Sequence, residues 1–297
     1  MAGLLAPLDW LLPDPHPPLV FEIGDGALVG ARRNGRSVTK VGGRDLPATT
    51  GEGSEPPLPD GLATGIESLL PDLGPHTSRL ASVLLPDSAV RLAVFEFEKL
   101  PRRPRDLRLA VQERFRSILR FDVRTARISY RRQPGHSAPS VLAAAVPQRY
   151  VEHCEEAVRL CGLVPAFVGA STASALNLVG ESGTEILLKL GGDSMAIAAA
   201  TDRAVKVFRT ISLQEGLEDD PAIAARDVLR DLFPTIVFVE GQLGRKVARV
   251  LLAGFGALQR PLLAAVSEAV GIQTGPLPVS GDASAGCGPG LLGYVHG

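Results

Sequence analysis

The sequence contains little of what marks the more specialised classes of protein. Aromatic residues make up 5% of its 297 residues, and cysteine occurs only as Cys154, Cys161 and Cys287. Cys154 and Cys161 lie two turns apart on one predicted helix, too far for a disulfide. No cysteine–histidine spacing is typical of a zinc site, and no apolar run reaches the roughly 20 residues that cross a bilayer. These absences predict a cytoplasmic protein with reduced, buried thiols and no structural metal.

What is present is the composition of an ordinary globular protein. Hydrophobic residues make up 45% of the chain and charged residues 21%. The 32 glycines and 24 prolines favour many short elements joined by tight turns. The length is sufficient for two medium domains or for one large bilobed domain.

The first 17 residues are apolar but do not have the pattern of a signal peptide. They lack a basic first region and are interrupted by Pro7 and Asp9. Six large apolar residues precede the first predicted strand: Leu4, Leu5, Leu8, Trp10, Leu11 and Leu12. Two interpretations stay open, namely a tail packed on its own domain and a latch that docks in a groove or on a partner.

Positive charge is concentrated in one segment, although the net charge of the chain is only -1. Residues 99–132 contain twelve lysines and arginines but only three acids. The segment could form a solvated face offset by acids elsewhere, or it could dock on acidic proteins or on an anionic inner-leaflet surface. It has few aromatic residues for stacking on bases and no helix-turn-helix signature, so we expect no nucleic-acid partner.

Several helices and strands are predicted from local signals. Apolar residues at helical spacing predict a helix that begins near Pro104 and exposes arginines. Residues 126–132 and 141–146 are predicted to pair as strands. Ser171 is predicted to cap a short helix, and Asp220 with Pro221 to begin a longer one. The glycine-rich residues 281–297 are expected to form a tail.

Three segments combine a strand with a glycine turn. Residues 21–28 and 188–195 each have the pattern strand–turn–strand, and residues 250–257 the pattern strand–turn–helix. Glycine lets the main chain approach a ligand closely, and the N–H groups of such turns can hold phosphates. All three could also be ordinary turns. Their order and spacing nevertheless resemble actin-like ATPases, in which two hairpins face each other across a nucleotide cleft.

The resemblance implies a set of nucleotide-binding positions. They are Gly24, Asp25, Gly26, Lys189, Gly191, Gly192, Asp193, Ser194, Gly254 and Gly256. Actin-like ATPases usually carry Asp in the strand before each phosphate turn, where it organises magnesium and the attacking water. Here the first position is Glu22 and the second is Lys189, while Phe255 could crowd an adenine. We therefore expect no catalytic residue, a degenerate cleft, and Lys189 paired with Asp193, Asp25 or Glu22. Binding of ATP with magnesium, without hydrolysis, stays open.

Other segments are similar to the PilM-type proteins, which are FtsA-related, actin-like scaffolds of the type IV pilus machine. Residues 84–91, 119–130 and 143–165 carry this resemblance, which extends over roughly residues 18–271. It implies an α/β, actin-like (ribonuclease H-like) fold of two lobes with a small inserted α+β subdomain. The predicted division is an apolar extension at 1–17, a first lobe at 18–93 and 163–182, a basic inserted subdomain at 94–162, and a second lobe at 183–297.

By the same resemblance, the chain is a non-catalytic assembly platform, cytoplasmic and peripheral to the inner membrane. Its implied partners are the cytoplasmic N-terminal peptide of a PilN-type membrane protein and the pilus motor ATPases. The peptide groove is expected near Arg114, Phe115, Ile118, Phe121, Ile128 and Tyr130, and the apolar extension could mimic the peptide. Two alternatives are an ATP-binding actin-like ATPase that switches or polymerises, and a cytoplasmic scaffold of type II secretion.

Overall fold

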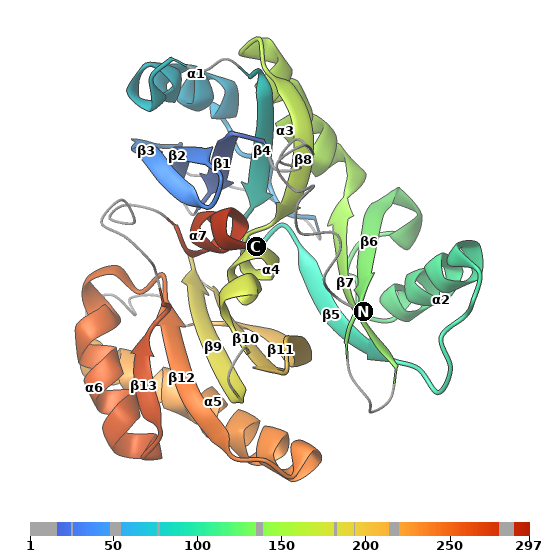
Figure 1. The fold of residues 1–297 in the computed structure, drawn as a ribbon, viewed down its shortest axis with the longest axis vertical. Coiled ribbons are helices and arrows are strands. Elements are labelled where there is room, and N and C mark those ends of the chain that lie inside the picture. Colours follow the sequence, from blue (N-terminus) through green and yellow to red (C-terminus); the bar gives the residue numbers. More distant parts are fainter. Residues whose placement is uncertain are drawn as a thin grey trace, which may run out of the picture.

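The computed structural model describes residues 17–24, 26–47, 55–75, 78–134, 139–180, 183–192, 194–213, 220–278 and 288–297. These residues form two five-stranded sheets and one three-stranded sheet. Figure 1 shows the two larger sheets one above the other, with the small sheet beside them. No helix in these ranges is long and apolar enough to span a membrane.

The first lobe is built on the sheet with strand order β3-β2-β1-β4-β8. Its strands are β1 (Leu19–Ile23), β2 (Ala27–Asn34), β3 (Ser37–Asp45), β4 (Leu80–Leu85) and β8 (Val164–Ala170). The first three strands are antiparallel neighbours, whereas β4 and β8 run parallel to β1. Helices α1 (Leu62–Leu73) and α3 (Gln148–Leu160) pack on one face of this sheet.

The second lobe repeats this topology with the strand order β11-β10-β9-β12-β13. Its strands are β9 (Thr184–Gly191), β10 (Ser194–Thr201), β11 (Ala204–Ser212), β12 (Val247–Ala253) and β13 (Gln273–Pro276). Helices α5 (Pro221–Leu243) and α6 (Gln259–Val270) cover one face, and Asp220 caps α5 as predicted. The repeat confirms the predicted two-lobed α/β architecture.

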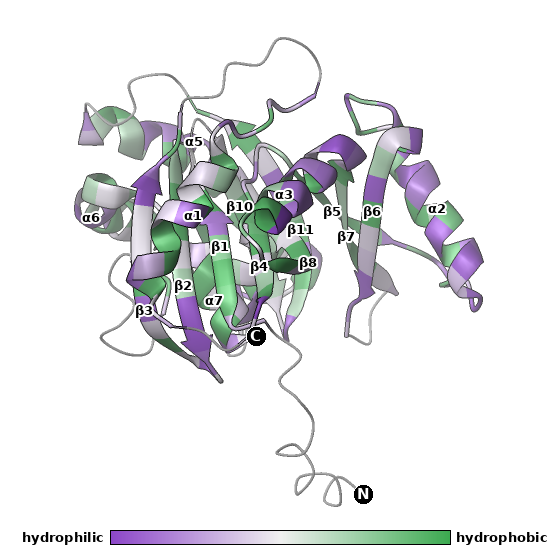
Figure 2. Cartoon of the chain, turned by 90° about the horizontal axis from the view of Figure 1, so that it is seen from above, coloured by the Kyte–Doolittle hydropathy of each residue, from purple (hydrophilic) through white to green (hydrophobic). Residues whose placement is uncertain are grey.

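The small subdomain is a three-stranded antiparallel sheet covered by one helix. Strands β5 (Arg91–Glu96), β7 (Ser140–Pro147) and β6 (Ala126–Arg132) lie in that order, which confirms the predicted pairing of the last two. Helix α2 (Pro104–Arg116) begins at the predicted proline and buries one stripe, with Phe115 edge-to-face on Phe95. In Figure 2, α2 is largely purple with green between, as expected when its other face carries arginines.

The last helix differs most from expectation. Residues 289–296 form α7 (Pro289–His296) rather than a tail. Its apolar side chains Leu291, Tyr294 and Val295 fill the face of the first sheet opposite α1, and α7 also packs on α4 (Ser171–Ala175). The prediction of a second lobe over 183–297 is therefore wrong for this helix. The predicted subdomain at 94–162 also differs, because α3 packs on the first lobe and β5 begins earlier.

Candidate functional site

The glycine turns of the two lobes meet around one cavity of 640 Å³. It lies where the first hairpin, the second hairpin and the turn after β12 come together. The predicted positions that line it are Gly24, Gly26, Lys189, Gly191, Gly192 and Gly254. Gly256 and Ser194 do not line it, and the Ser194 hydroxyl donates to the carbonyl of Gly191. Asp25 and Asp193 lie outside the described residues.

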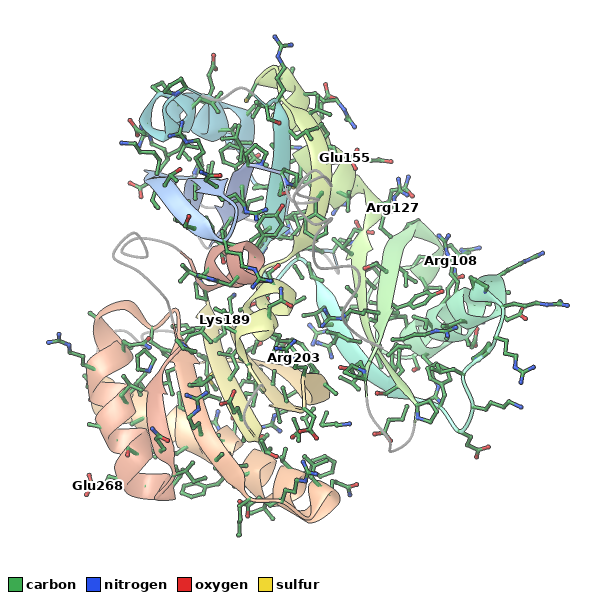
Figure 3. All side chains as sticks on the ribbon, viewed as in Figure 1. Arg108, Arg127, Glu155, Lys189, Arg203 and Glu268 are labelled. Atoms are coloured by element: carbon green, nitrogen blue, oxygen red, sulfur yellow. The ribbon has the colours of Figure 1, made fainter. Side chains whose placement is uncertain are left out.

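A buried ion pair joins the two lobes at this cavity. The ammonium of Lys189 lies 2.7 Å from a carboxylate oxygen of Asp87, and the two side chains are only 5% and 4% exposed. Asp87 also accepts the hydroxyl of Thr172 at 2.6 Å and its backbone N–H at 3.3 Å. Since Asp87 follows β4 and Lys189 lies in β9, the pair connects the first lobe to the second. Figure 3 shows Lys189 at the end of the second lobe that faces the first.

The identity of this partner corrects the prediction. Asp87 was not among the three acids expected to pair with Lys189, and the carboxylate of Glu22 is engaged elsewhere. The two partners are separated by 102 positions, so no local pattern could have connected them. The one available signal is an acid two positions after a buried strand, at the end of the sheet that faces the cavity.

Glu22 lines the interlobe cavity, but its carboxylate holds the beginning of the last helix. One carboxylate oxygen accepts the N–H of Gly290 at 3.1 Å, and the other accepts the N–H of Leu291 at 2.7 Å. The hydroxyl of Ser171 also donates to this carboxylate, so the prediction that Ser171 caps a helix is wrong. A Cβ at position 290 would lie 2.7 Å from Glu22 and 2.3 Å from the Ser171 oxygen, which explains the glycine there. An acid at a helix N-terminus is stabilised by the unpaired N–H groups and by the helix dipole.

The third turn is shaped by packing within the second lobe. Phe255 is buried in the core under α5 and α6, so the prediction that it crowds an adenine is wrong. Gly254 has a φ of 82°, and a Cβ there would lie 2.4 Å from the carbonyl oxygen of Leu190. Only glycine allows β12 to turn this close to β9.

These contacts bear on whether magnesium fits the cavity. Magnesium is usually bound through carboxylates and phosphate oxygens. Of the two positions where actin-like ATPases carry Asp, one is a lysine and the other is a glutamate held by a helix terminus and a hydroxyl. Within the described ranges, no group of three His, Cys, Asp or Glu residues could hold a metal ion. The backbone N–H groups of the turns are the chemistry that the cavity offers to a phosphate.

A second cavity, of 330 Å³, forms a groove between the first lobe and the small subdomain. Its walls are residues 165–170 of β8, residues 127–129 of β6 and one side of α3. Both β8 and β6 are the last strands of their sheets in the described part of the chain, so each presents a backbone edge with no strand beside it. Figure 3 shows Arg127 on β6 and Glu155 on α3 at this groove.

The predicted partner-binding residues mostly lie elsewhere. Ile128 lines the groove, but Phe115 is fully buried between α2 and the small sheet and cannot touch a peptide. Arg114 lies 5.5 Å from the ring of Phe97, and the Tyr130 hydroxyl donates to the carbonyl of Pro104. Ile118, Phe121 and Tyr130 are partly buried, and none of them lines the groove. The prediction for Phe115 is wrong because the stripe that signalled a groove is the core of the small subdomain.

The prediction of buried thiols is confirmed for Cys154 and not for Cys161. Cys154 is buried in the first lobe, and burial raises the pKa of its thiol to about 12. Cys161 is partly exposed, and its thiol donates to the carbonyl of Ala63. Cys287 lies outside the described residues. Burial also raises the pKa of Tyr150, whose side chain borders the interlobe cavity.

No protein-family model matches the sequence, and no curated protein matches it. Among solved structures, the chain is similar to one from the PilM–PilN type IV pilus biogenesis complex. The TM-score is 0.71 and the identity 19%, over 89% of this chain and 88% of that chain. A Bacteroides thetaiotaomicron protein with an actin-like ATPase fold and unknown function gives a TM-score of 0.50 at 9% identity, over 86% and 89%. The cytoplasmic domain of EpsL, an inner-membrane component of the Vibrio cholerae type II secretion system, gives 0.47 at 13%, over 84% and 94%. The first two similarities establish the predicted actin-like fold.

Proposed function

We propose that this chain is a non-catalytic assembly platform of a type IV pilus machine that binds the cytoplasmic N-terminal peptide of a PilN-type inner-membrane protein. The observation that carries this proposal is the groove between two open strand edges, β8 and β6. The solved structure with a similar fold, which matches 89% of this chain, comes from a PilM–PilN complex. Binding such a peptide would hold the chain, in the cytoplasm, at the inner membrane.

The groove has the features that an extended peptide requires. A peptide strand beside β8 or β6 can form main-chain hydrogen bonds along its length, while alternate side chains enter pockets. Val146, Val151 and Val168 offer apolar surface for those side chains. Arg127 and Glu155 supply one charge of each sign for polar groups of the peptide.

The interlobe cavity supports the non-catalytic part of the proposal. The Lys189–Asp87 pair connects the lobes through the protein's own charges, a role that a bound nucleotide with magnesium could otherwise fill. Neither Lys189 nor the engaged Glu22 carboxylate is suited to organise magnesium and an attacking water. We therefore expect no ATP hydrolysis. Turnover of ATP with magnesium by the purified chain would overturn this part.

Calorimetric titration with the N-terminal peptide of the PilN-type protein from the same genome tests the platform. We expect saturable one-to-one binding that Ala166→Glu weakens at least tenfold, because Ala166 is an exposed residue of β8 within the groove. Arg127→Glu should also weaken binding. Its matched control is Arg108→Glu, an exposed arginine on α2 that lies away from the groove in Figure 3 and should have no effect.

Two results would contradict the proposal. No saturable binding by any form of the chain would remove the pilus assignment and leave the fold. Equal loss of affinity in Arg127→Glu and Arg108→Glu would show that general electrostatic attraction, and not the groove, holds the peptide.

A further inference from the structure

The flank of the first lobe beside the groove exposes an unusual amount of apolar surface. Leu80, Leu160, Val164 and Phe167 are large hydrophobic residues that are 44% to 71% exposed. Leu80 and Val164 are register partners at the beginning of β4 and β8, and Leu160 ends the helix before β8. Phe167 lines the groove itself. Apolar side chains are thus exposed both near the beginning of the first sheet and in the groove.

The chain enters the first sheet at the same place. Leu19 begins β1 and is aligned with Ala81 of β4, which is aligned with Pro165 of β8. Pro165 forms one end of the groove. Since neighbouring strands lie about 4.8 Å apart, a new strand beside β8 would be about 15 Å from β1. About five extended residues cover that distance.

The first 16 residues are long enough to reach and fill the groove. Five residues for the route leave about 11, whereas the six groove-lining residues of β8 need a strand of about equal length. A segment that comes from the Pro165 end would run antiparallel to β8.

The sequence of this segment suits an added strand. Side chains alternate across a strand, and the even positions from 4 to 12 are all apolar: Leu4, Ala6, Leu8, Trp10 and Leu12. The odd positions from 5 to 13 are mixed: Leu5, Pro7, Asp9, Leu11 and Pro13. Because N–H groups also alternate between the two edges of a strand, both prolines leave the edge formed by even residues intact. That edge can pair with β8 while the apolar face covers the groove.

We propose that residues 1–16 dock in the groove beside β8 and occupy the site of the partner peptide. The docking is an inference from the groove and the segment alone, whereas the competition rests on the proposed function. A short tether keeps the segment at a local concentration in the millimolar range, so weak contacts suffice for occupancy. If the segment fills the groove nine-tenths of the time, it weakens partner binding about tenfold.

Trp10 is the one tryptophan of the chain and reports on docking directly. In the full-length protein we expect its emission to be shifted to shorter wavelength and shielded from iodide. Ala166→Glu or Ser129→Glu, exposed groove positions on β8 and β6, should make it as quenchable as in a free peptide of residues 1–17. The matched control is Ala222→Glu, an exposed alanine of the second lobe, which should leave Trp10 shielded.

The segment itself supplies a second pair of variants. Leu8→Asp lies on the face of Trp10 and should release the segment, whereas Leu11→Asp lies on the opposite face and should have a smaller effect. In the calorimetric titration, Leu8→Asp should bind the partner peptide about tenfold more tightly than wild type.

The outcomes separate this inference from the proposed function. A fully quenchable Trp10 in the wild-type chain overturns the docking, as does shielding that both groove variants leave unchanged. Groove-dependent shielding without partner binding to Leu8→Asp supports the docking but refutes the proposed partner. Partner binding that Leu8→Asp leaves unchanged supports the platform and overturns the competition.

Discussion

Replacing Lys189 with methionine removes the cation of the interlobe pair and retains most of the apolar stem. Asp87 would then be a buried carboxylate without its counter-ion. Removing one partner of a buried pair typically costs 3–5 kcal/mol. Asp87 keeps two hydrogen bonds from Thr172, which lower the penalty for the remaining charge. We therefore expect a loss of about 3 kcal/mol, at the lower end of that range.

Urea unfolding of the full chain measures this loss through the transition midpoint. Adding Asp87→Asn to Lys189→Met neutralises the stranded charge and should recover about 2 kcal/mol, as a double-mutant cycle would show. Arg116→Met is the surface control, because its pair with Glu113 is 66% and 65% exposed and is worth about 1 kcal/mol at most. If Lys189→Met cost no more than this control, the pair would not be holding the lobes together.

Three further predictions follow from local contacts. Gly290→Ala should lower the thermal midpoint by the equivalent of about 2 kcal/mol, because the added Cβ would overlap Glu22 and Ser171. An unchanged midpoint would show that the beginning of α7 does not lie against these two residues. Asp220→Ala should cost about 1 kcal/mol in the same assay through loss of the α5 cap, whereas Asp220→Asn should cost little. In a Cys287→Ser background at pH 8, iodoacetamide should modify Cys161 well before Cys154. Burial excludes the reagent from Cys154 and raises the pKa of its thiol to about 12. Equal rates of modification, measured by mass spectrometry, would contradict the packing of α3.

Local signals in the sequence predict the architecture well. A glycine turn after a buried strand, a proline in a first helical turn and an Asp cap each depend on a few neighbouring residues. The three glycine turns predict two lobes that meet at a cavity, and five of the glycines do line it. The predicted helix at Pro104 and the strand pair of the small subdomain are of the same kind.

The site depended on contacts that no local pattern encodes. The partner of Lys189 is 102 positions away, and the backbone donors to Glu22 are 268 and 269 positions away. The prediction for Phe115 was wrong because an apolar stripe on a helix indicates a buried face but does not identify the element or partner that the face packs against. The groove lies between the edges of two sheets, so it becomes visible only when strand order is known.

The seating of α7 on Glu22 also sets an order for folding. Domains generally fold as their residues leave the ribosome, the first ones earliest. Here the carboxylate of Glu22 in β1 receives the N–H of Leu291, 269 positions later, only after α7 has been synthesised. Until then the face of the first sheet that α7 covers is also exposed. The last described strand of the second lobe, β13, ends at Pro276, before α7 begins at Pro289. The lobe that is synthesised first is thus completed last, and a nascent chain would expose its unfinished apolar face throughout synthesis.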